Sequence, residues 1–185
     1  MTVITAKEPK RIYVASSWRN DFQNAIVILL RSAGFEVYDF KKPAQDTGFR
    51  WSSIDPNWSR WSAKQYKAAL QHDLAERGFN SDFDAMKWAD ACVLVLSAGS
   101  SAHLEAGYFT GAGKELHILL READIHGHAG GSRPCARCGD MDGCFYSDAE
   151  LKDPPMAAEA ELMYKMATSI NANPMELLGS LGVKD

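Results

Sequence analysis

A glutamate follows the most apolar segment of the chain, at a spacing that suits chemistry at the edge of a sheet. The run Ala91–Leu96 leads into the small-residue turn Ser97–Ser101, and a helical pattern then begins with Glu105 in or just after its first turn. A buried strand, a tight turn and a helix form the unit of parallel α/β sheets, whose ligands bind at the carboxyl ends of the strands. A helix N-terminus favours an ionised carboxylate. We therefore expect Glu105 to be ionised beside a pocket, where a carboxylate can act as a nucleophile.

A second carboxylate, Asp82, precedes the same strand. Two carboxyl groups beside one pocket can divide the work, because one attacks while the other supplies or relays a proton. Asp82 is therefore a candidate acid or orienting group. The alternative is that it caps a helix over Phe83–Ala89, and one side chain can do both. Asp90 marks the junction between that helix and the strand, and we expect it to be structural.

Polar side chains also open the first helix of the chain. Ser17 and Arg19 lie in the turn after an expected strand at Arg11–Ser16. Free backbone N–H groups at a helix N-terminus, a hydroxyl and a guanidinium together suit a phosphate or a sugar hydroxyl. The alternative is a helix cap and a solvated arginine. Ser100 and Ser101 supply further hydroxyl groups in the turn before Glu105.

The segment 49–61 holds three of the five tryptophans of the chain, among them Trp51. It follows the second expected strand, so it leaves the sheet at the same edge as the expected site. Planar aromatic side chains stack on nucleobases, and a loop that binds a base and excludes water would suit such a site. The alternative is a surface loop that its aromatic residues attach to the core.

The elements that must position these residues alternate between strands and helices. Alternation of this kind predicts a three-layer, doubly wound parallel α/β sheet in a single domain. We assign this domain to residues 1–170, with a Cys- and Gly-rich loop insertion at 121–149, and treat 171–185 as a C-terminal tail. The expected strands are Arg11–Ser16, Phe35–Phe40, Ala91–Leu96 and Leu116–Leu120, with a possible fifth at Cys144–Ser147; the expected helices are Asp21–Ser32, Trp61–Arg77, Phe83–Ala89, Ala102–Ala112 and Met156–Ile170.

Composition narrows the function further. The chain has 185 residues, 46% of them hydrophobic and 24% charged, and a net charge of −4. These values suit one globular domain and argue against binding to a nucleic-acid polymer or a membrane surface. The N-terminal segment lacks the apolar core of a signal peptide, so we expect a cytoplasmic protein. The chain also lacks the glycine-rich fingerprints of dinucleotide and P-loop sites.

Three cysteines fall within one loop. Cys135, Cys138 and Cys144, completed by His128 or His126, have the residue types of a structural zinc site. The alternative is a loop with reduced thiols. A fourth cysteine, Cys92, lies inside an expected strand and is read as a small buried hydrophobic residue.

The region around Glu105 resembles the nucleoside 2-deoxyribosyltransferase family and the related nucleoside 5'-monophosphate N-glycosidases. The likeness covers about Arg11–Leu120 and, loosely, the last expected helix. The residues that carry it are Asp82, Ala89, Asp90, the strand Ala91–Leu96, Glu105, Gly107, Tyr108, Gly111, Gly113 and Lys114.

This resemblance implies a flavodoxin-like fold and a Glu105 that attacks the anomeric carbon of a ribosyl or deoxyribosyl group. It also implies that Asp82 is the acid, and that Ser17 and Arg19 hold a 5'-phosphate with help from Ser100 or Ser101. Tyr13 matches an aromatic position close to the nucleophile, where its hydroxyl could orient Glu105; a core tyrosine is the alternative. The family needs no cofactor and often forms homodimers.

Three functions remain open. The transferases usually carry an aspartate six positions before the nucleophile, and this chain has Gly99 there. That difference favours hydrolysis of a nucleoside or nucleoside 5'-monophosphate over transfer of the sugar to another base. The third possibility is a nucleotide sensor without catalytic activity on the same fold.

Overall fold

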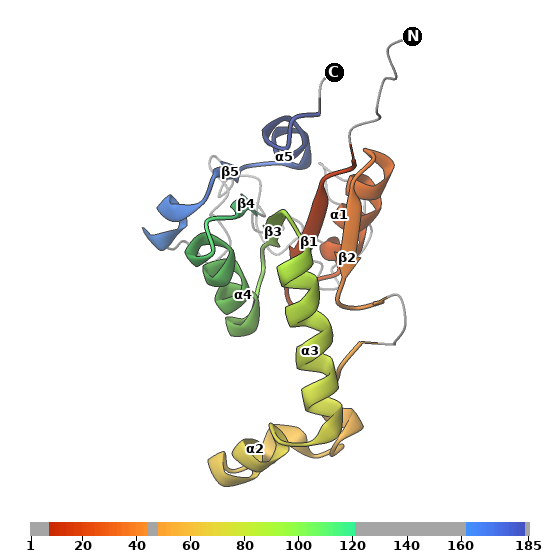
Figure 1. Ribbon diagram of the computed structural model, residues 1–185. Coiled ribbons are helices and arrows are strands. Elements are labelled where there is room, and N and C mark those ends of the chain that lie inside the picture. The colour runs from red at the N-terminus through yellow and green to blue at the C-terminus, as the bar shows by residue number, and fades with distance from the viewer. Residues whose placement is uncertain (1–7, 44–47, 121–161, 184–185) are drawn as a thin grey trace, which may run out of the picture.

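Five parallel strands form the single sheet of a computed structural model that describes residues 8–43, 48–120 and 162–183. The strand order is β2-β1-β3-β4-β5, the order of a flavodoxin-like fold. The strands are β1 (Arg11–Ala15), β2 (Glu36–Asp39), β3 (Ala91–Val95), β4 (Glu115–Leu119) and β5 (Ser169–Asn171), shown in Figure 1. The helices are α1 (Phe22–Ser32), α2 (Ala63–Ala69), α3 (Asp73–Trp88), α4 (Ser100–Gly111) and α5 (Pro174–Ser180), with 3₁₀ turns η1 (Trp51–Ser53), η2 (Trp58–Arg60) and η3 (Leu162–Met166).

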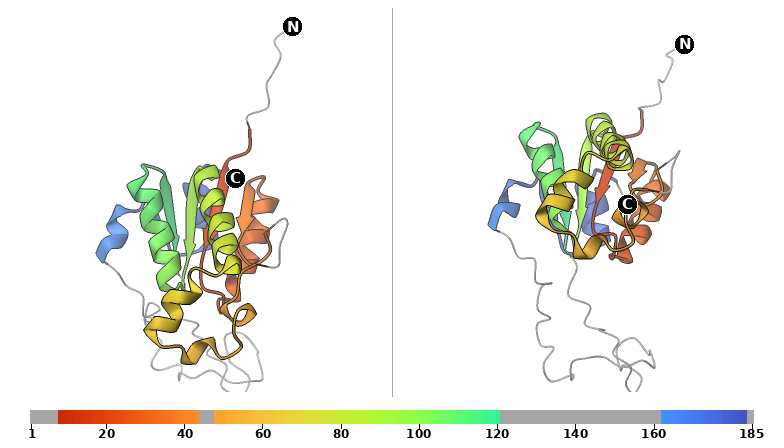
Figure 2. Two further views of the ribbon diagram at one scale, coloured as in Figure 1. Left: turned by 60° about the horizontal axis from the view of Figure 1, so that its bottom comes forward. Right: turned by 90° about the horizontal axis from the view of Figure 1, so that it is seen from below.

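Each face of the sheet has its own core, because successive residues of a strand point to opposite sides. Tyr13 and Ala15 of β1 pack on the side covered by α3 and α4. Ile12 and Val14 pack on the side covered by α1 and α5. The three layers expected from the sequence are confirmed, and Figure 2 shows them from two further directions. No helix in the described ranges is both long and apolar enough to span a membrane.

The helices before β3 differ from the expected Trp61–Arg77 and Phe83–Ala89. The first expected helix breaks at His72, whose backbone is extended. The His72 ring nitrogen accepts the Leu74 N–H at 3.1 Å and so caps a new helix. That helix, α3, then runs without interruption through Gly78 to Trp88. Asp82 therefore lies inside a helix and caps none. The N-terminal part of α3 and all of α2 extend beyond the carboxyl edge of the sheet (Figure 1).

The C-terminal segment also differs from expectation. The described part of the expected helix Met156–Ile170 is the 3₁₀ turn η3 followed by the fifth strand, β5. The alternative fifth strand at Cys144–Ser147 lies outside the described residues. Asn173 then caps α5 by accepting two backbone N–H groups, and Leu177 is fully buried against the sheet. The stretch expected to be a tail thus packs against the core.

Gly78 is required by a close approach between α3 and the tryptophan-rich segment. A Cβ atom at this position would lie 2.6 Å from the Cβ of Phe49, a contact that flexing of a side-chain tip cannot relieve. We expect Gly78→Ala to lower the free energy of unfolding by about 1–3 kcal/mol through overpacking, despite the better helix propensity of alanine. Chemical denaturation measures this change.

Gly107 is the matched control, since it also lies inside a helix but no described atom other than its chain neighbours and its own helix backbone lies within 4 Å of its Cβ position. Gly107→Ala should therefore raise the free energy of unfolding by about 0.5–1 kcal/mol. If both substitutions stabilise the protein, Phe49 does not pack on α3 as the structure shows.

Polar contacts also stabilise the amino edge of the sheet, at the end opposite the candidate site. Asp90 accepts hydrogen bonds from the Arg11 backbone and guanidinium, which lowers the pKa of its carboxyl group to about 2. The Lys114 ammonium donates to the carbonyl oxygens of Met86, Lys87 and Ala89 at the end of α3. The structural role expected for Asp90 is confirmed, and Lys114 has a structural role beside it.

Candidate active site

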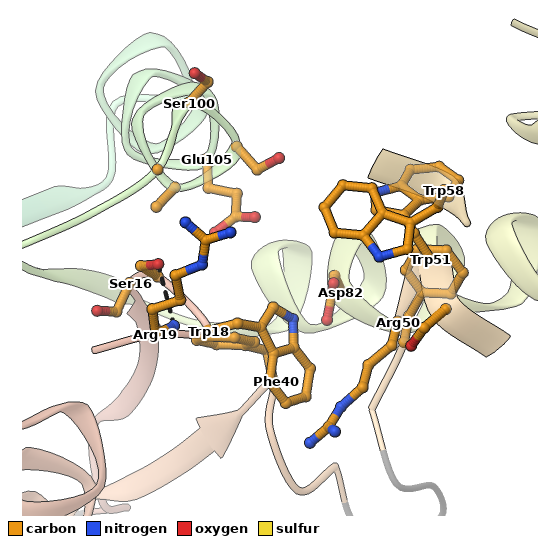
Figure 3. Close-up of a pocket in the computed structure, with 16 residues that line it drawn as sticks. Ser16, Trp18, Arg19, Phe40, Arg50, Trp51, Trp58, Asp82, Ser100 and Glu105 are labelled. Atoms are coloured by element: carbon orange, nitrogen blue, oxygen red, sulfur yellow. Dashed lines mark hydrogen bonds between the residues drawn. The ribbon is translucent and has the colours of Figure 1, made fainter. Parts of the chain in front are cut away.

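A cavity of about 650 Å³ opens at the carboxyl edge of the sheet, a volume typical of small-molecule sites. The loops after β1, β2 and β3 and one face of α3 enclose it (Figure 3). Its lining includes all but one of the catalytic and substrate-binding residues expected from the sequence. The lining residues are Ser16, Ser17, Trp18, Arg19, Phe40, Phe49, Arg50, Trp51, Ser52, Trp58, Asp82, Gly99, Ser100, Ser101, Ala102 and Glu105.

Buried hydrogen bonds tie the turn after β1 to the end of β3. The Ser16 hydroxyl donates to the Val95 carbonyl oxygen at 2.8 Å. The Asn20 amide donates to the Ser16 hydroxyl at 3.0 Å and to the Ser97 carbonyl oxygen at 3.1 Å. Two loops distant in sequence are thus held as one wall of the cavity.

Glu105 lies on α4, partly buried at the cavity wall. Burial and the negative charge of Asp82 raise the pKa of Glu105 to about 7, and the Tyr13 hydroxyl acts in the opposite direction. The expectation that the helix N-terminus keeps this carboxylate firmly ionised is therefore wrong, because Glu105 lies beyond the first turn and its desolvation outweighs the dipole. Near neutral pH the residue is poised between its two protonation states.

Asp82 reaches the same cavity from α3. Its carboxyl group accepts a hydrogen bond of 2.8 Å from the Tyr38 hydroxyl. Burial raises the pKa of Asp82, and the hydrogen bond from Tyr38 opposes that rise. Both carboxyl groups of the pair thus have raised pKa values, mainly because burial disfavours their charged forms.

Tyr13 is completely buried beneath the carboxyl pair and does not line the cavity. Among the described residues its hydroxyl has no hydrogen-bond partner. Burial, with the charges of Glu105 and Asp82, raises the pKa of Tyr13 far above its usual value, so the hydroxyl keeps its proton. The structure thus brings a donor close to Glu105, as the predicted orienting role requires, and also makes Tyr13 a core residue.

One end of the cavity suits an anion. Ser17, Ser100 and Ser101 line it together with the N-terminus of α4, which has no side-chain cap. The Ser17 hydroxyl accepts the Arg19 backbone N–H at 3.2 Å, so Ser17 also stabilises its own turn. Figure 3 shows the Arg19 side chain directed toward the part of the cavity that holds Glu105.

Aromatic side chains form the opposite wall. Trp51 lines the cavity as expected, and Phe49, Trp61 and Tyr66 pack around its ring with centroid distances of 4.7, 5.7 and 5.5 Å. Trp58 lines the same wall and is 39% exposed. A planar ligand entering the cavity would meet the ring of Trp51, which its three aromatic neighbours hold in place.

Arg50 is a second cation at the cavity that sequence reasoning did not single out. Its guanidinium lies over the ring of Trp18, 4.8 Å from the centroid, and points away from Glu105 in Figure 3. Within the described part of the chain, neither Arg19 nor Arg50 forms an ion pair with a carboxylate. Both therefore remain available to an anionic ligand.

Tyr38, Arg50 and Trp18 are the site residues that sequence reasoning missed. Tyr38 lies two residues before the end of the expected second strand, and Trp18 lies between the two polar residues that were singled out. The position of Trp18 between Ser17 and Arg19 is enough to predict it as a site residue, because the side chains of that turn lie at the carboxyl edge.

The expected zinc ligands Cys135, Cys138, Cys144, His126 and His128 all lie outside the described residues. Within residues 8–43, 48–120 and 162–183 no cluster of three or more potential ligands could hold a metal ion. Cys92 is buried in β3, as expected. The structural zinc site stays a prediction.

Comparisons with known proteins support the fold of this chain and assign it to no family. No protein-family model matches the chain, and no curated protein matches it either. A solved structure of a 2-deoxyribosyltransferase from Bacillus psychrosaccharolyticus matches 59% of this chain and 71% of its own with 20% identity and a TM-score of 0.35, too low for any argument. A conserved protein from Enterococcus faecalis V583 matches 94% of this chain and 97% of its own, with 12% identity and a TM-score of 0.50. The chain therefore has the flavodoxin-like α/β fold of a known structure.

Proposed function

We propose that this protein cleaves the N-glycosidic bond of a nucleoside or a nucleoside 5'-monophosphate. The observation that carries the proposal is the meeting of Glu105 and Asp82 in one cavity, where burial raises the pKa of both carboxyl groups and the charge of Asp82 raises that of Glu105 further. Glycosidic bonds are commonly broken by two carboxyl groups with different protonation states. The resemblance of the segment around Glu105 to nucleoside-processing enzymes supports the choice of a nucleoside.

The reaction needs one proton on the carboxyl pair. With Glu105 ionised and Asp82 neutral, a Glu105 oxygen attacks the anomeric carbon while the bond from that carbon to the base nitrogen breaks. Asp82 gives its proton to the departing base. Asp82, now ionised, then takes a proton from water, whose oxygen bonds to the anomeric carbon as the bond to Glu105 breaks. Both residues return to their starting states.

The rest of the cavity fits the rest of such a substrate. Aromatic rings of Trp51 and Trp58 offer stacking surfaces for the base, worth about 1–3 kcal/mol per stacked base. Arg19, the serine hydroxyls and the N-terminus of α4 offer donors for a 5'-phosphate or 5'-hydroxyl. Transfer of the sugar to another base uses the same first step, with the new base in place of water.

The test is release of free base from a panel of nucleosides and 5'-monophosphates, followed by chromatography with and without an acceptor base. Release without an acceptor supports hydrolysis, and a new nucleoside formed only with an acceptor supports transfer. If no compound of the panel releases its base under either condition, the proposed chemistry is wrong for these substrates, and tight binding without turnover would indicate a sensor.

Replacement of Arg19 tests the anion end. We expect Arg19→Gln to raise KM for a 5'-monophosphate about 10- to 100-fold, because the loss of a charge-assisted hydrogen bond weakens binding by about that factor. KM for the matching nucleoside should change much less. Steady-state kinetics on both substrates measure this difference. Arg60→Gln is the control, because Arg60 is exposed on η2 and does not line the cavity. Equal effects of Arg19→Gln on both substrates would contradict a phosphate contact.

A further inference from the structure

Two tyrosines lie side by side beneath the carboxyl pair. Tyr13 of β1 and Tyr38 of β2 are partners in the parallel register of the two strands. Their rings stack with centroids 5.5 Å apart and planes 13° from parallel. Because the strands fix this stack, the two hydroxyl groups have fixed places under Glu105 and Asp82.

The two hydroxyl groups are used differently. The Tyr38 hydroxyl donates its only hydrogen to Asp82 at 2.8 Å, so the Ser81 hydroxyl, 3.0 Å away, must be the donor to Tyr38. The Tyr13 hydroxyl has no hydrogen-bond partner among the described residues. A donor that is already in place favours the charged form of a carboxyl group. Asp82 thus has a formed hydrogen bond from Tyr38, whereas the Tyr13 hydroxyl lies near Glu105 and lowers its pKa without a hydrogen bond of ordinary geometry.

We propose that Tyr38 is a positioning residue that holds Asp82 as the ionised member of the pair before substrate binds and so leaves the shared proton on Glu105. The proposal rests on the proposed function for its catalytic meaning, because a protonated Glu105 cannot attack. The proton must move from Glu105 to Asp82 when the substrate enters, and the spare Tyr13 hydroxyl is placed to stabilise Glu105 once it is charged. Tyr38 thereby masks the nucleophile until the cavity is occupied.

Other charged or titratable groups face the pair and do not remove this asymmetry. Tyr13 and Cys92 lie in the buried core, where burial raises the pKa of both and keeps them neutral. The cations Arg19 and Arg50 line the cavity without forming an ion pair to Asp82 or Glu105 within the described ranges. The one hydrogen bond to either carboxyl group of the pair that meets ordinary geometry in this part of the chain is that from Tyr38.

The first test uses the protein without substrate. Side-chain carboxyl carbons are followed by ¹³C NMR from pH 3 to pH 9 in the wild type, Tyr38→Phe and Tyr108→Phe. Loss of a hydrogen bond to a charged group should raise the apparent pKa of Asp82 by about one to two units in Tyr38→Phe. Tyr108 is the matched control, since it is also partly buried but neither lines the cavity nor bonds to a carboxylate in the described structure; we expect less than about 0.3 unit there.

Two outcomes would overturn the proposal. One is an Asp82 titration that is the same in the wild type and in Tyr38→Phe. The other is a wild type in which Glu105 ionises before Asp82. In the background of Asp82→Asn, Tyr38→Phe should no longer change the titration of Glu105, and a remaining change would show that Tyr38 acts by another route.

Kinetics separate this proposal from the proposed function. Because Tyr38→Phe raises the proton affinity of the pair, both limbs of the pH–rate profile should move to higher pH, whereas a purely structural role would lower the rate and leave the limbs in place. Unmoved limbs would contradict the proposal. If no variant releases a base, the proposed function fails, and the NMR titration still decides whether Tyr38 controls the proton.

Discussion

Glu105→Ala should abolish base release from any substrate that the wild type cleaves. We expect the rate to fall by at least about 10⁴-fold, because loss of the attacking group removes the covalent route altogether. The same variant should fail to accumulate a glycosyl–enzyme adduct in quenched reactions, which mass spectrometry of the intact protein measures.

Two control variants test whether the loss of base release in Glu105→Ala comes from a loss of fold. Glu105→Gln keeps the size of the side chain and removes its charge, so it should retain substrate binding without turnover. Glu76→Gln removes a carboxylate of α3 that is exposed and does not line the cavity, and its rate should stay within about twofold of the wild type. Base release by Glu105→Ala within tenfold of the wild-type rate would rule out Glu105 as the nucleophile.

Asp82→Asn should have the second largest effect and should change the pH profile in shape as well as in height. We expect a loss of about 10²–10⁴-fold with bases that need a proton to depart. In the wild type the active form holds one proton on the pair, so the rate should fall below the raised pKa of Asp82 and again above about pH 7, where Glu105 loses its proton.

In Asp82→Asn the alkaline limb should vanish. Removal of a negative neighbour lowers the pKa of Glu105 from about 7, so Glu105 is ionised over a wider range and no second proton is lost. The rate should rise with pH and then stay level. With a substrate whose leaving group departs without protonation, such as the p-nitrophenyl derivative of the same sugar, Asp82→Asn should lower the rate much less than with a natural base. A bell-shaped profile that persists in Asp82→Asn would show that Asp82 is not the acid.

The sequence was a good guide to the sheet and to the residues at its carboxyl edge. Strands β1 and β3 are buried on both faces, so they appear as continuous apolar runs, and polar residues directly after them must lie at the edge. That is why Ser17, Arg19 and Glu105 were placed together without any contact information.

Contacts across the fold explain what was missed. Gly78 looks like a helix terminator, yet it lies inside α3 because Phe49, which comes from another segment, needs the space. Tyr38 contacts Asp82 and Arg50 contacts Trp18, and only the packing of strands and loops brings these pairs together. The raised pKa of Glu105 likewise depends on burial, which a helix position alone does not fix.

The tryptophan-rich segment 49–61 contacts α3 and the turn after β1 through Phe49 and Arg50. Phe49 packs against Gly78, and Arg50 lies over the ring of Trp18. Glu105, Asp82 and Tyr38, in contrast, belong to the sheet and to helices that pack on it. Under the proposed function, base selectivity and reactivity would therefore depend on different stretches of the chain. A library restricted to residues 51–60 would sample new bases and analogues while every group that moves a proton or forms a bond stays as it is.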